Sequence, residues 1–276
     1  MPQSLDRRWL ARKIDKNKVL FISDLHLGFE IEWVGRGLKT SIPNWSIEIL
    51  NTLRNEIMKL KPSHLVICGD FEHHFSLRQK GKKKVSILIP ESMRERITQT
   101  FNSKILSIPD LEIMFVCGEH DIFLYQEFKE KCEVVSSSGT HLFNHIGVFH
   151  GDQQPFKEIV FSSEIFLGHV HPTITLKDDL QVQHKFPVFT KLSLPREDIF
   201  SLFNFPFELE EVGMIDSLPI NILPAYNPYI PGYLLNKIDG GRKLHKDYPV
   251  IRQILRHPEL QIQLTDGIDL GLLLDL

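Results

Sequence analysis

Three short apolar runs in the first half of the chain each end in a cluster of polar side chains. The runs cover residues 18–22, 64–68 and 111–117, and the clusters that follow them are Ser23-Asp24-Leu25-His26, Gly69-Asp70 and Gly118-Glu119-His120-Asp121. Runs of this length, rich in β-branched and aromatic residues, are typical of buried strands. The pattern therefore predicts strands that end at a site of chemistry.

Helical spacing separates these strands. Apolar residues recur every three or four positions within residues 44–60, and a second helix is expected at 91–101. Strands that alternate with helices indicate an α/β fold with a parallel sheet, in which ligands bind beyond the carboxyl ends of the strands. The three polar clusters fall at these ends.

The second half of the chain has a different pattern. Short candidate strands at 133–135, 146–150, 165–168 and 187–192 are separated by Gly, Pro and Ser, which predicts a second, more antiparallel layer. From residue 218 the chain is rich in proline, and its apolar end at 267–276 is expected to form a closing strand or a docking tail. We therefore divide the chain into a domain at 1–217 and a C-terminal elaboration at 218–276, packed on the same domain.

Composition limits the classes of partner. The chain has 276 residues, of which 42% are hydrophobic, so it can bury a large core. A net charge of −3 gives no overall field that would attract nucleic acid or a membrane. No apolar window approaches the roughly 18 residues of a membrane span, and the basic N-terminus lacks the apolar stretch of a secretory signal. The three cysteines form no disulfide framework and are expected to be reduced thiols. These features predict a cytoplasmic protein without a membrane partner.

Histidines complete a set of candidate metal ligands. His150 precedes Gly151, and Gly168-His169-Val170-His171 repeats the two-residue spacing of Asp24 and His26. Residues two apart share one face of an extended segment, so each pair can hold a cation. A single histidine is more often an ordinary core or surface residue, but the ordered set favours a metal site. Imidazole and carboxylate together suit Mn, Fe, Zn or Co better than Ca or Mg.

The order Asp-x-His, Gly-Asp, Gly-x-His-Asp, His-Gly, Gly-His-x-His resembles the calcineurin-like metallophosphoesterase superfamily over residues 21–172. The segments 24–30, 69–73 and 223–227 are similar to archaeal phosphoesterases related to SbcD and to the nuclease subunit of the double-strand-break repair complex. The resemblance implies a four-layer α/β/β/α sandwich and two divalent metal ions, with Mn expected and Fe, Zn or Co as alternatives. It also implies hydrolysis of phosphodiester bonds by a metal-bridged hydroxide.

The resemblance also assigns residues to the two metals. Asp24, His26 and His171 would bind one ion, His150 and His169 the other, and Asp70 would bridge them. The remaining family ligand is an asparagine, where this chain has Glu119. Glu119 could ligate in its place, shift the preference toward harder ions, or weaken the second site. We expect ligation with altered activity.

Three further residues receive catalytic roles from the resemblance. His120 would stabilise the transition state or protonate the leaving oxygen. Asp121 would hold the imidazole of His120 in a useful tautomer. His73 would contact the scissile phosphate.

A basic run follows the Gly69-to-His73 motif and contains Arg78, Lys80, Lys82, Lys83 and Lys84. It could bind a phosphate backbone, although such runs are usually solvated loops, and no aromatic residues are interleaved with it for base stacking. Together with the resemblance, this basic run favours DNA or RNA as a partner. A second copy of the chain and a repair protein are further possible partners. The alternatives are a small-molecule phosphodiesterase or phosphomonoesterase, and a binding scaffold weakened by Glu119.

Overall fold

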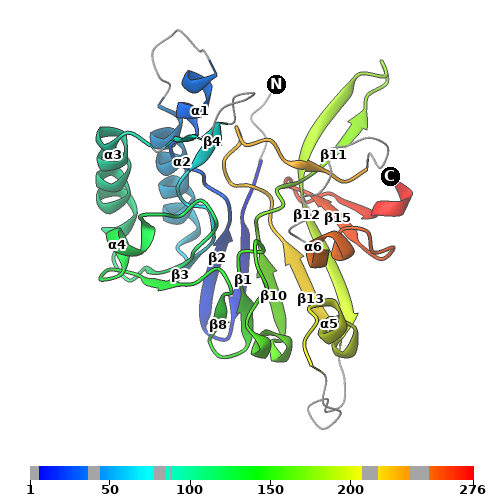
Figure 1. The fold of residues 1–276 in the computed structure, drawn as a ribbon. Helices are drawn as coiled ribbons and strands as arrows, with labels where there is room; N and C mark the ends of the chain where they lie inside the picture. Colours follow the sequence, from blue (N-terminus) through cyan, green and yellow to red (C-terminus); the bar gives the residue numbers. More distant parts are fainter. Residues whose placement is uncertain (1–5, 37–43, 78–84, 88, 207–216, 237–248) are drawn as a thin grey trace.

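Two β-sheets packed face to face form the centre of the molecule, and helices cover their outer faces (Figure 1). The computed structural model describes residues 6–36, 44–77, 85–87, 89–206, 217–236 and 249–276. The predicted α/β class with α/β/β/α layers is confirmed.

The first sheet has the strand order β1-β2-β3-β6-β7. Its strands are β1 (Leu10–Ile14), β2 (Asn17–Ile22), β3 (His64–Cys68), β6 (Glu112–Val116) and β7 (Glu133–Val135). All neighbours pair in parallel except β1 and β2. Helices α2 (Trp45–Leu60) and α3 (Glu91–Phe101) lie outside it, and the apolar stripe of α2 is buried because its residues recur at helical spacing. The predicted strands and helices of this half are confirmed to within a residue or two.

The second sheet runs β14-β11-β12-β13-β10-β9-β8, with β15 paired to β12 and β16 to β15. Its strands are β8 (Thr140–Leu142), β9 (Ile146–Val148), β10 (Glu164–Leu167), β11 (Pro172–Lys177), β12 (Gln183–Pro195), β13 (Ser217–Ile222), β14 (Tyr233–Leu234), β15 (Gln261–Leu264) and β16 (Asp269–Leu272). Most pairs are antiparallel, as expected, but β10 is parallel to β9 and β13, and β11 is parallel to β14. Helices α5 (Arg196–Leu202) and α6 (Pro249–Ile254) cover its outer face.

Shorter elements connect these layers. They are α1 (Glu30–Gly35), the hairpin strands β4 (Phe75–Leu77) and β5 (Val85–Ile87), a π-helical turn at Asn102–Leu106, α4 (Leu124–Phe128), and 3₁₀ turns at Lys157–Phe161 and Leu273–Asp275. Among the described residues, no helix combines the length and apolar character that crossing a membrane requires.

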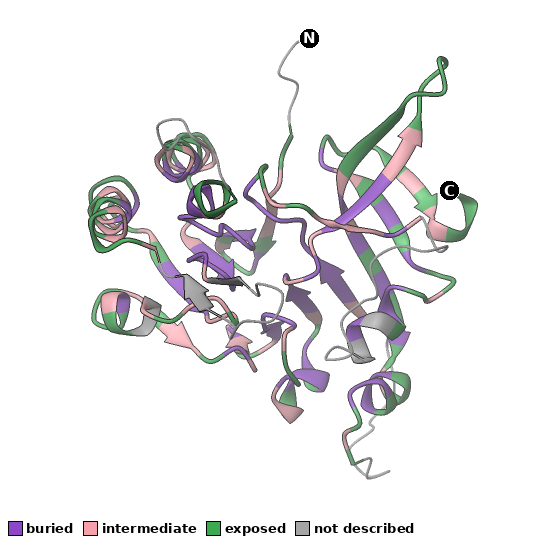
Figure 2. Ribbon diagram, turned by 45° about the horizontal axis from the view of Figure 1, so that its top comes forward, coloured by how far each residue is buried: buried purple, intermediate pink, exposed green. Residues whose placement is uncertain are grey.

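Three apolar clusters fill the spaces between the four layers, and the strands are correspondingly buried (Figure 2). Between the sheets, Phe21 of β2 stacks on Phe166 of β10 with ring centroids 4.0 Å apart. Cys68 lies in the same cluster, and burial raises the pKa of its thiol, which suits a small apolar role. This central layer holds the two sheets together.

The C-terminal region contributes to the second sheet. β13 lies between β12 and β10, and β15 and β16 extend the sheet from β12. The apolar end of the chain forms β16 and a 3₁₀ turn. The division of the chain at residue 217 stays a prediction.

Candidate metal centre

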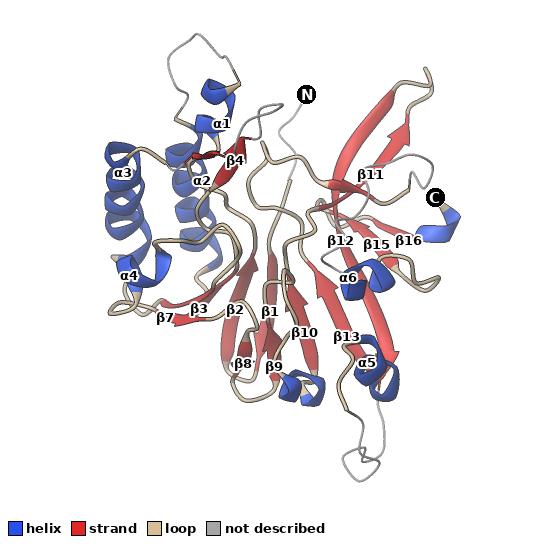
Figure 3. Ribbon diagram, viewed as in Figure 1, coloured by secondary structure: helices blue, strands red, loops and turns tan. Residues whose placement is uncertain are grey.

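Six of the predicted ligands meet where strands of both sheets end (Figure 3). Asp24 and His26 follow β2, Asp70 follows β3, His150 follows β9, and His169 and His171 follow β10. They form two groups, each with its ligand atoms within 4.8 Å of one another: Asp24, His26 and His171 in one, and Asp70, His150 and His169 in the other. This is the grouping that the resemblance implied.

Asp70 lies between the two groups. Its Oδ2 is 3.5 Å from Nε2 of His26 and 3.4 Å from Nε2 of His150, which belong to different groups. Nε2 of His171 is 3.0 Å from Oδ1 of Asp24. A carboxylate in this position could contact two ions at once.

The backbone turns these side chains inward through left-handed conformations. The φ angles are 55° at Asp24, 42° at His26, 49° at Asp70, 67° at His169 and 49° at His171. Positive φ is uncommon for residues with a Cβ and costs free energy, and such strain clusters at functional sites. The expectation that each pair lies on an extended strand is therefore wrong: the strands end earlier, and left-handed turns bring the donors together.

Glycines next to the ligands allow close packing. A Cβ added at Gly69 would lie 2.0 Å from Nδ1 of His150, and one at Gly118 would lie 2.1 Å from Oδ1 of Asp70. At Gly168 it would lie 1.6 Å from Oγ of Ser23. The glycines of the three motifs are thus required by the space around the ligands.

Backbone and hydroxyl groups orient the ligands. Nδ1 of His150 donates to the carbonyl of Cys68 at 2.9 Å, which leaves Nε2 facing Asp70. The hydroxyl of Ser23 donates to Asp24, and the backbone N–H of His169 donates to the same carboxylate at 3.0 Å. Such partners fix the orientation of metal ligands.

Glu32, which the sequence did not single out, orients His26 through His73. Nε2 of His73 is 3.2 Å from a carboxylate oxygen of Glu32 and must donate to it, and Nδ1 of His73 is 3.2 Å from Nδ1 of His26. Burial lowers the pKa of His73, so its ring is neutral, and its Nδ1 accepts a hydrogen bond from the Nδ1–H of His26. Nε2 of His26 then presents a lone pair to the centre. His73 is buried, and its ring nitrogens form a further group with those of His26 and His120, with ligand atoms within 4.8 Å of one another. Its contact with the scissile phosphate stays a prediction.

His120 lies at the edge of the centre, with Nε2 3.9 Å from Oδ2 of Asp70. Its Nδ1 accepts the backbone N–H of His74 at 3.2 Å, so the neutral ring carries its proton on Nε2. Asp121 does not set this tautomer: its two oxygens accept the backbone N–H groups of Glu72 and Gly118. The expected contact from Asp121 to His120 is corrected accordingly, because the carboxylate is occupied by the loop backbone.

Glu119 lies outside both groups. Its side chain is 49% exposed, and Oε1 is 3.8 Å from Nε2 of His120. Its ligation of a metal stays a prediction. The basic residues Arg78, Lys80, Lys82, Lys83 and Lys84 lie outside the described residues, in the connection between the paired strands β4 and β5.

The protonation of the centre suits divalent cations. Burial would raise the pKa of Asp24, but His171 outweighs it and lowers the pKa to about 2. Burial would likewise raise the pKa of Asp70, but His150 holds it well below its usual range. Burial lowers the pKa of His26 and brings that of His169 to about 3, so both rings are neutral and have lone pairs to offer. Burial would also lower the pKa of His150 and of His171, but Asp70 and Asp24 respectively raise them. A cation bound between the carboxylates would displace the protons of these two rings, because metal ligands must be deprotonated.

The comparisons with known proteins agree with this geometry. The profile of the calcineurin-like phosphoesterases matches residues 17–264. The chain belongs to this family. The family binds a dimetal centre, and the six clustered residues of this calcineurin-like phosphoesterase are groups that could hold one.

Two solved structures align with the chain at low sequence identity. The nuclease MPE of Pseudomonas putida aligns with 14% identity and a TM-score of 0.49, covering 95% of this chain and 100% of that one. A protein of unknown function from Aquifex aeolicus aligns with 18% identity and a TM-score of 0.34, covering 55% and 78%. No curated protein matches the sequence.

Proposed function

We propose that this phosphoesterase is a dimetal-dependent phosphodiesterase directed at nucleic acid. The observation that carries the dimetal part is the position of Asp70, whose Oδ2 faces an imidazole of each ligand group. Asp24, His26 and His171 would hold one ion, His150 and His169 the other, and Asp70 both. When bound, the ions supply the Lewis acidity that activates water and neutralises the phosphate.

His120 serves the reaction from the edge of the centre. Because its Nδ1 is occupied by the N–H of His74, its Nε2–H is available to a phosphate oxygen or to the leaving oxygen. Asp121 supports this role indirectly, since its bonds to Glu72 and Gly118 hold the loop that carries His120.

The preference for nucleic acid is supported by the sequence. The basic run at 78–84 begins four residues after His74 and could follow a phosphate backbone. The similarity of the motif segments to SbcD-related phosphoesterases points the same way. We expect Mn to be the metal, because imidazole and carboxylate ligands together suit this ion.

The first test is hydrolysis of bis-para-nitrophenyl phosphate with Mn. We expect activity in the intact protein and a loss of at least about 100-fold in Asp70→Ala, since even partners behind metal ligands can contribute that much. Asp178→Ala is the matched control, because Asp178 also faces a histidine, His184, but on the exposed β11–β12 turn. If the intact protein is inactive and the Glu119→Asn variant is active, the result would instead favour a binding scaffold.

The second test addresses the substrate. Replacing the five basic residues of the run by alanine should weaken cleavage of single-stranded DNA and spare the small aryl diester, because only the polymer reaches them. Equal effects on both substrates would overturn the preference for nucleic acid and favour a small-molecule phosphodiesterase.

A further inference from the structure

Three aromatic side chains from distant parts of the sequence form an exposed cluster. Trp45, at the start of α2, stacks on Tyr229 with ring centroids 4.3 Å apart and planes 17° apart. Trp33 of α1 meets Trp45 edge to face at 6.2 Å. Trp33 is 46% exposed and Tyr229 39%. We call these three residues the aromatic platform; exposed groups of large rings mark binding sites more often than chance surface.

The platform adjoins the metal centre on two sides. Trp33 follows Glu32, whose carboxylate contacts His73 behind the ligand His26. Tyr229 donates its backbone N–H to the side chain of Asn227 at 2.9 Å. The platform is therefore separated from the ligand His26 only by short chains of contacts.

The second of these chains runs through Asn227. The amide of Asn227 donates to the carbonyl of Leu25 at 2.9 Å, between the ligands Asp24 and His26. In Figure 3, α1 and the loop after β13 both lie at the end of the molecule where β2 and β3 terminate. The platform and the metal centre therefore lie at the same end of the molecule.

Hydrogen bonds hold together the two helices that carry Trp33 and Trp45. Ser46, next to Trp45, accepts the backbone N–H of Gly28 at 2.7 Å and donates to Glu30 at 2.8 Å, which ties α2 to the start of α1. All of these partners are buried or part of the ligand-bearing loops. A surface whose rings are already positioned loses little entropy when a flat ligand stacks on it.

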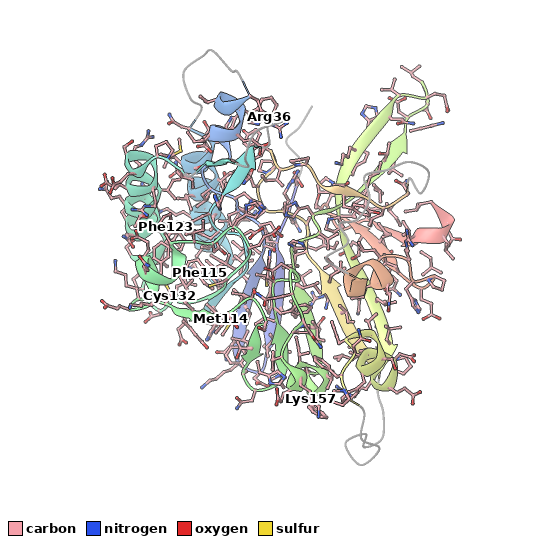
Figure 4. All side chains as sticks on the ribbon, viewed as in Figure 1. Arg36, Met114, Phe115, Phe123, Cys132 and Lys157 are labelled. Atoms are coloured by element: carbon pink, nitrogen blue, oxygen red, sulfur yellow. The ribbon has the colours of Figure 1, made fainter. Side chains whose placement is uncertain are left out.

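From this arrangement we infer that the platform stacks an unpaired base of a single-stranded nucleic acid whose phosphate lies at the metal centre. The inference rests on the proposed function and narrows its substrate to single-stranded segments. Bases in a duplex are already stacked and paired, whereas an unpaired base offers a free face to any aromatic ring. Arg36, exposed at the end of α1 (Figure 4), forms an ion pair with Glu32 beside Trp33.

The test is a double-mutant cycle between protein and substrate. Trp33→Ala and Tyr229→Ala are compared with the intact protein on a single-stranded oligonucleotide and on the same strand with one abasic position, moved along the sequence. We expect each variant to reduce kcat/KM for the strand about 5- to 100-fold, the range for one stacked base. At one abasic position near the cleaved bond, intact protein and variant should differ little, because the base that stacks is gone.

Two controls separate stacking from damage. Trp33→Phe keeps an aromatic face and should restore most of the loss. Phe161→Ala removes a ring that is 45% exposed on the turn carrying Lys157, at the opposite end of the molecule in Figure 4, and should leave the oligonucleotide kinetics unchanged.

The outcomes distinguish the two proposals. If the intact protein cleaves the aryl diester but no oligonucleotide, the preference for nucleic acid fails and the platform loses its ligand. If it cleaves oligonucleotides but Trp33→Ala and Tyr229→Ala behave like Phe161→Ala, the platform inference alone is overturned. A loss that is the same at every abasic position would also overturn it, since the rings would then act without a base.

Discussion

Glu119, which the motif resemblance aligns with a family asparagine, has its carboxylate 3.8 Å from the imidazole of His120. A carboxylate at a dimetal centre adds negative charge and raises the pKa of activated water. Glu119→Asn should therefore lower that pKa and move the acidic limb of the kcat/KM profile to lower pH. The measurement is the pH dependence of aryl diester hydrolysis with Mn.

A matched control exists for this variant. Glu112 faces His64 at 3.3 Å where β6 and β3 begin, at the ends of these strands opposite the ligands. Glu112→Asn should leave the profile where it is. If Glu119→Asn also leaves the acidic limb in place, Glu119 does not act on the metals and the predicted ligation is wrong.

Glu32 acts on the centre without touching the six ligands. The hydrogen bond from His73 lowers the pKa of Glu32 and keeps it ionised, so the bond that orients His73 and His26 is charge-assisted. Glu32→Gln makes this bond neutral, and we expect about 10-fold weaker Mn binding, as for other partners of metal ligands. Calorimetric titration of the metal-free protein measures it. Glu48→Gln, on the exposed face of α2, is the control, and an unchanged affinity in Glu32→Gln would show that the carboxylate is dispensable.

The loop after β13 is attached to α2 by a partly buried hydrogen bond. The hydroxyl of Tyr226 donates to Glu56 at 2.6 Å, and burial together with Glu56 raises the pKa of Tyr226 well above 10.0. The folded protein therefore keeps a proton that the unfolded chain loses above pH 10.0. The contact contributes stability below that pH, and the contribution is lost as the pH rises beyond it.

Tyr226→Phe should show both effects. At neutral pH it should lower the free energy of unfolding by about 1 kcal/mol, the usual net value of a hydrogen bond. Between about pH 8 and pH 11, its Tm should fall less than that of the intact protein, because the titrating phenol is gone. The measurement is Tm at about pH 8 and pH 11 for the intact protein, for Tyr226→Phe and for the control Tyr229→Phe, whose ring is more exposed. Parallel alkaline losses in all three proteins would contradict the linkage.

Over the whole molecule, the sequence predicted what depends on local pattern. The strand periodicities and the helix at 45–60 are visible along the chain, and parallel strands place their carboxyl ends at one edge, so the ligand clusters of β2 and β3 had to meet. The left-handed φ of residues such as Asp24 could not be predicted from the sequence pattern. This conformation places the side chain at the metal centre, and it produces no periodic spacing of apolar residues. Glu32 and the aromatic platform depend on contacts between residues far apart in the chain, which no spacing rule connects.

The ligands come from both sheets, and this makes the metals part of the fold. Asp24, His26 and Asp70 follow strands of the first sheet, whereas His150, His169 and His171 follow strands of the second. Ions bound here would join the two sheets above the Phe21–Phe166 stack. A ligand that binds only the folded state stabilises it by about 2.7 kcal/mol at one hundred times its Kd.

Removing metal with a chelator should therefore lower Tm by roughly 5–10 °C, given the usual shift per kcal/mol for a chain of this size. Adding Mn back should restore Tm in the intact protein and in His184→Ala, whose imidazole faces Asp178 outside the centre. Asp70→Ala should respond much less, because it loses the carboxylate that contacts both ligand groups. If chelation abolishes hydrolysis but leaves Tm unchanged, the ions act in catalysis and do not stabilise the fold. The apolar layer between the two sheets is then sufficient to hold the sheets together.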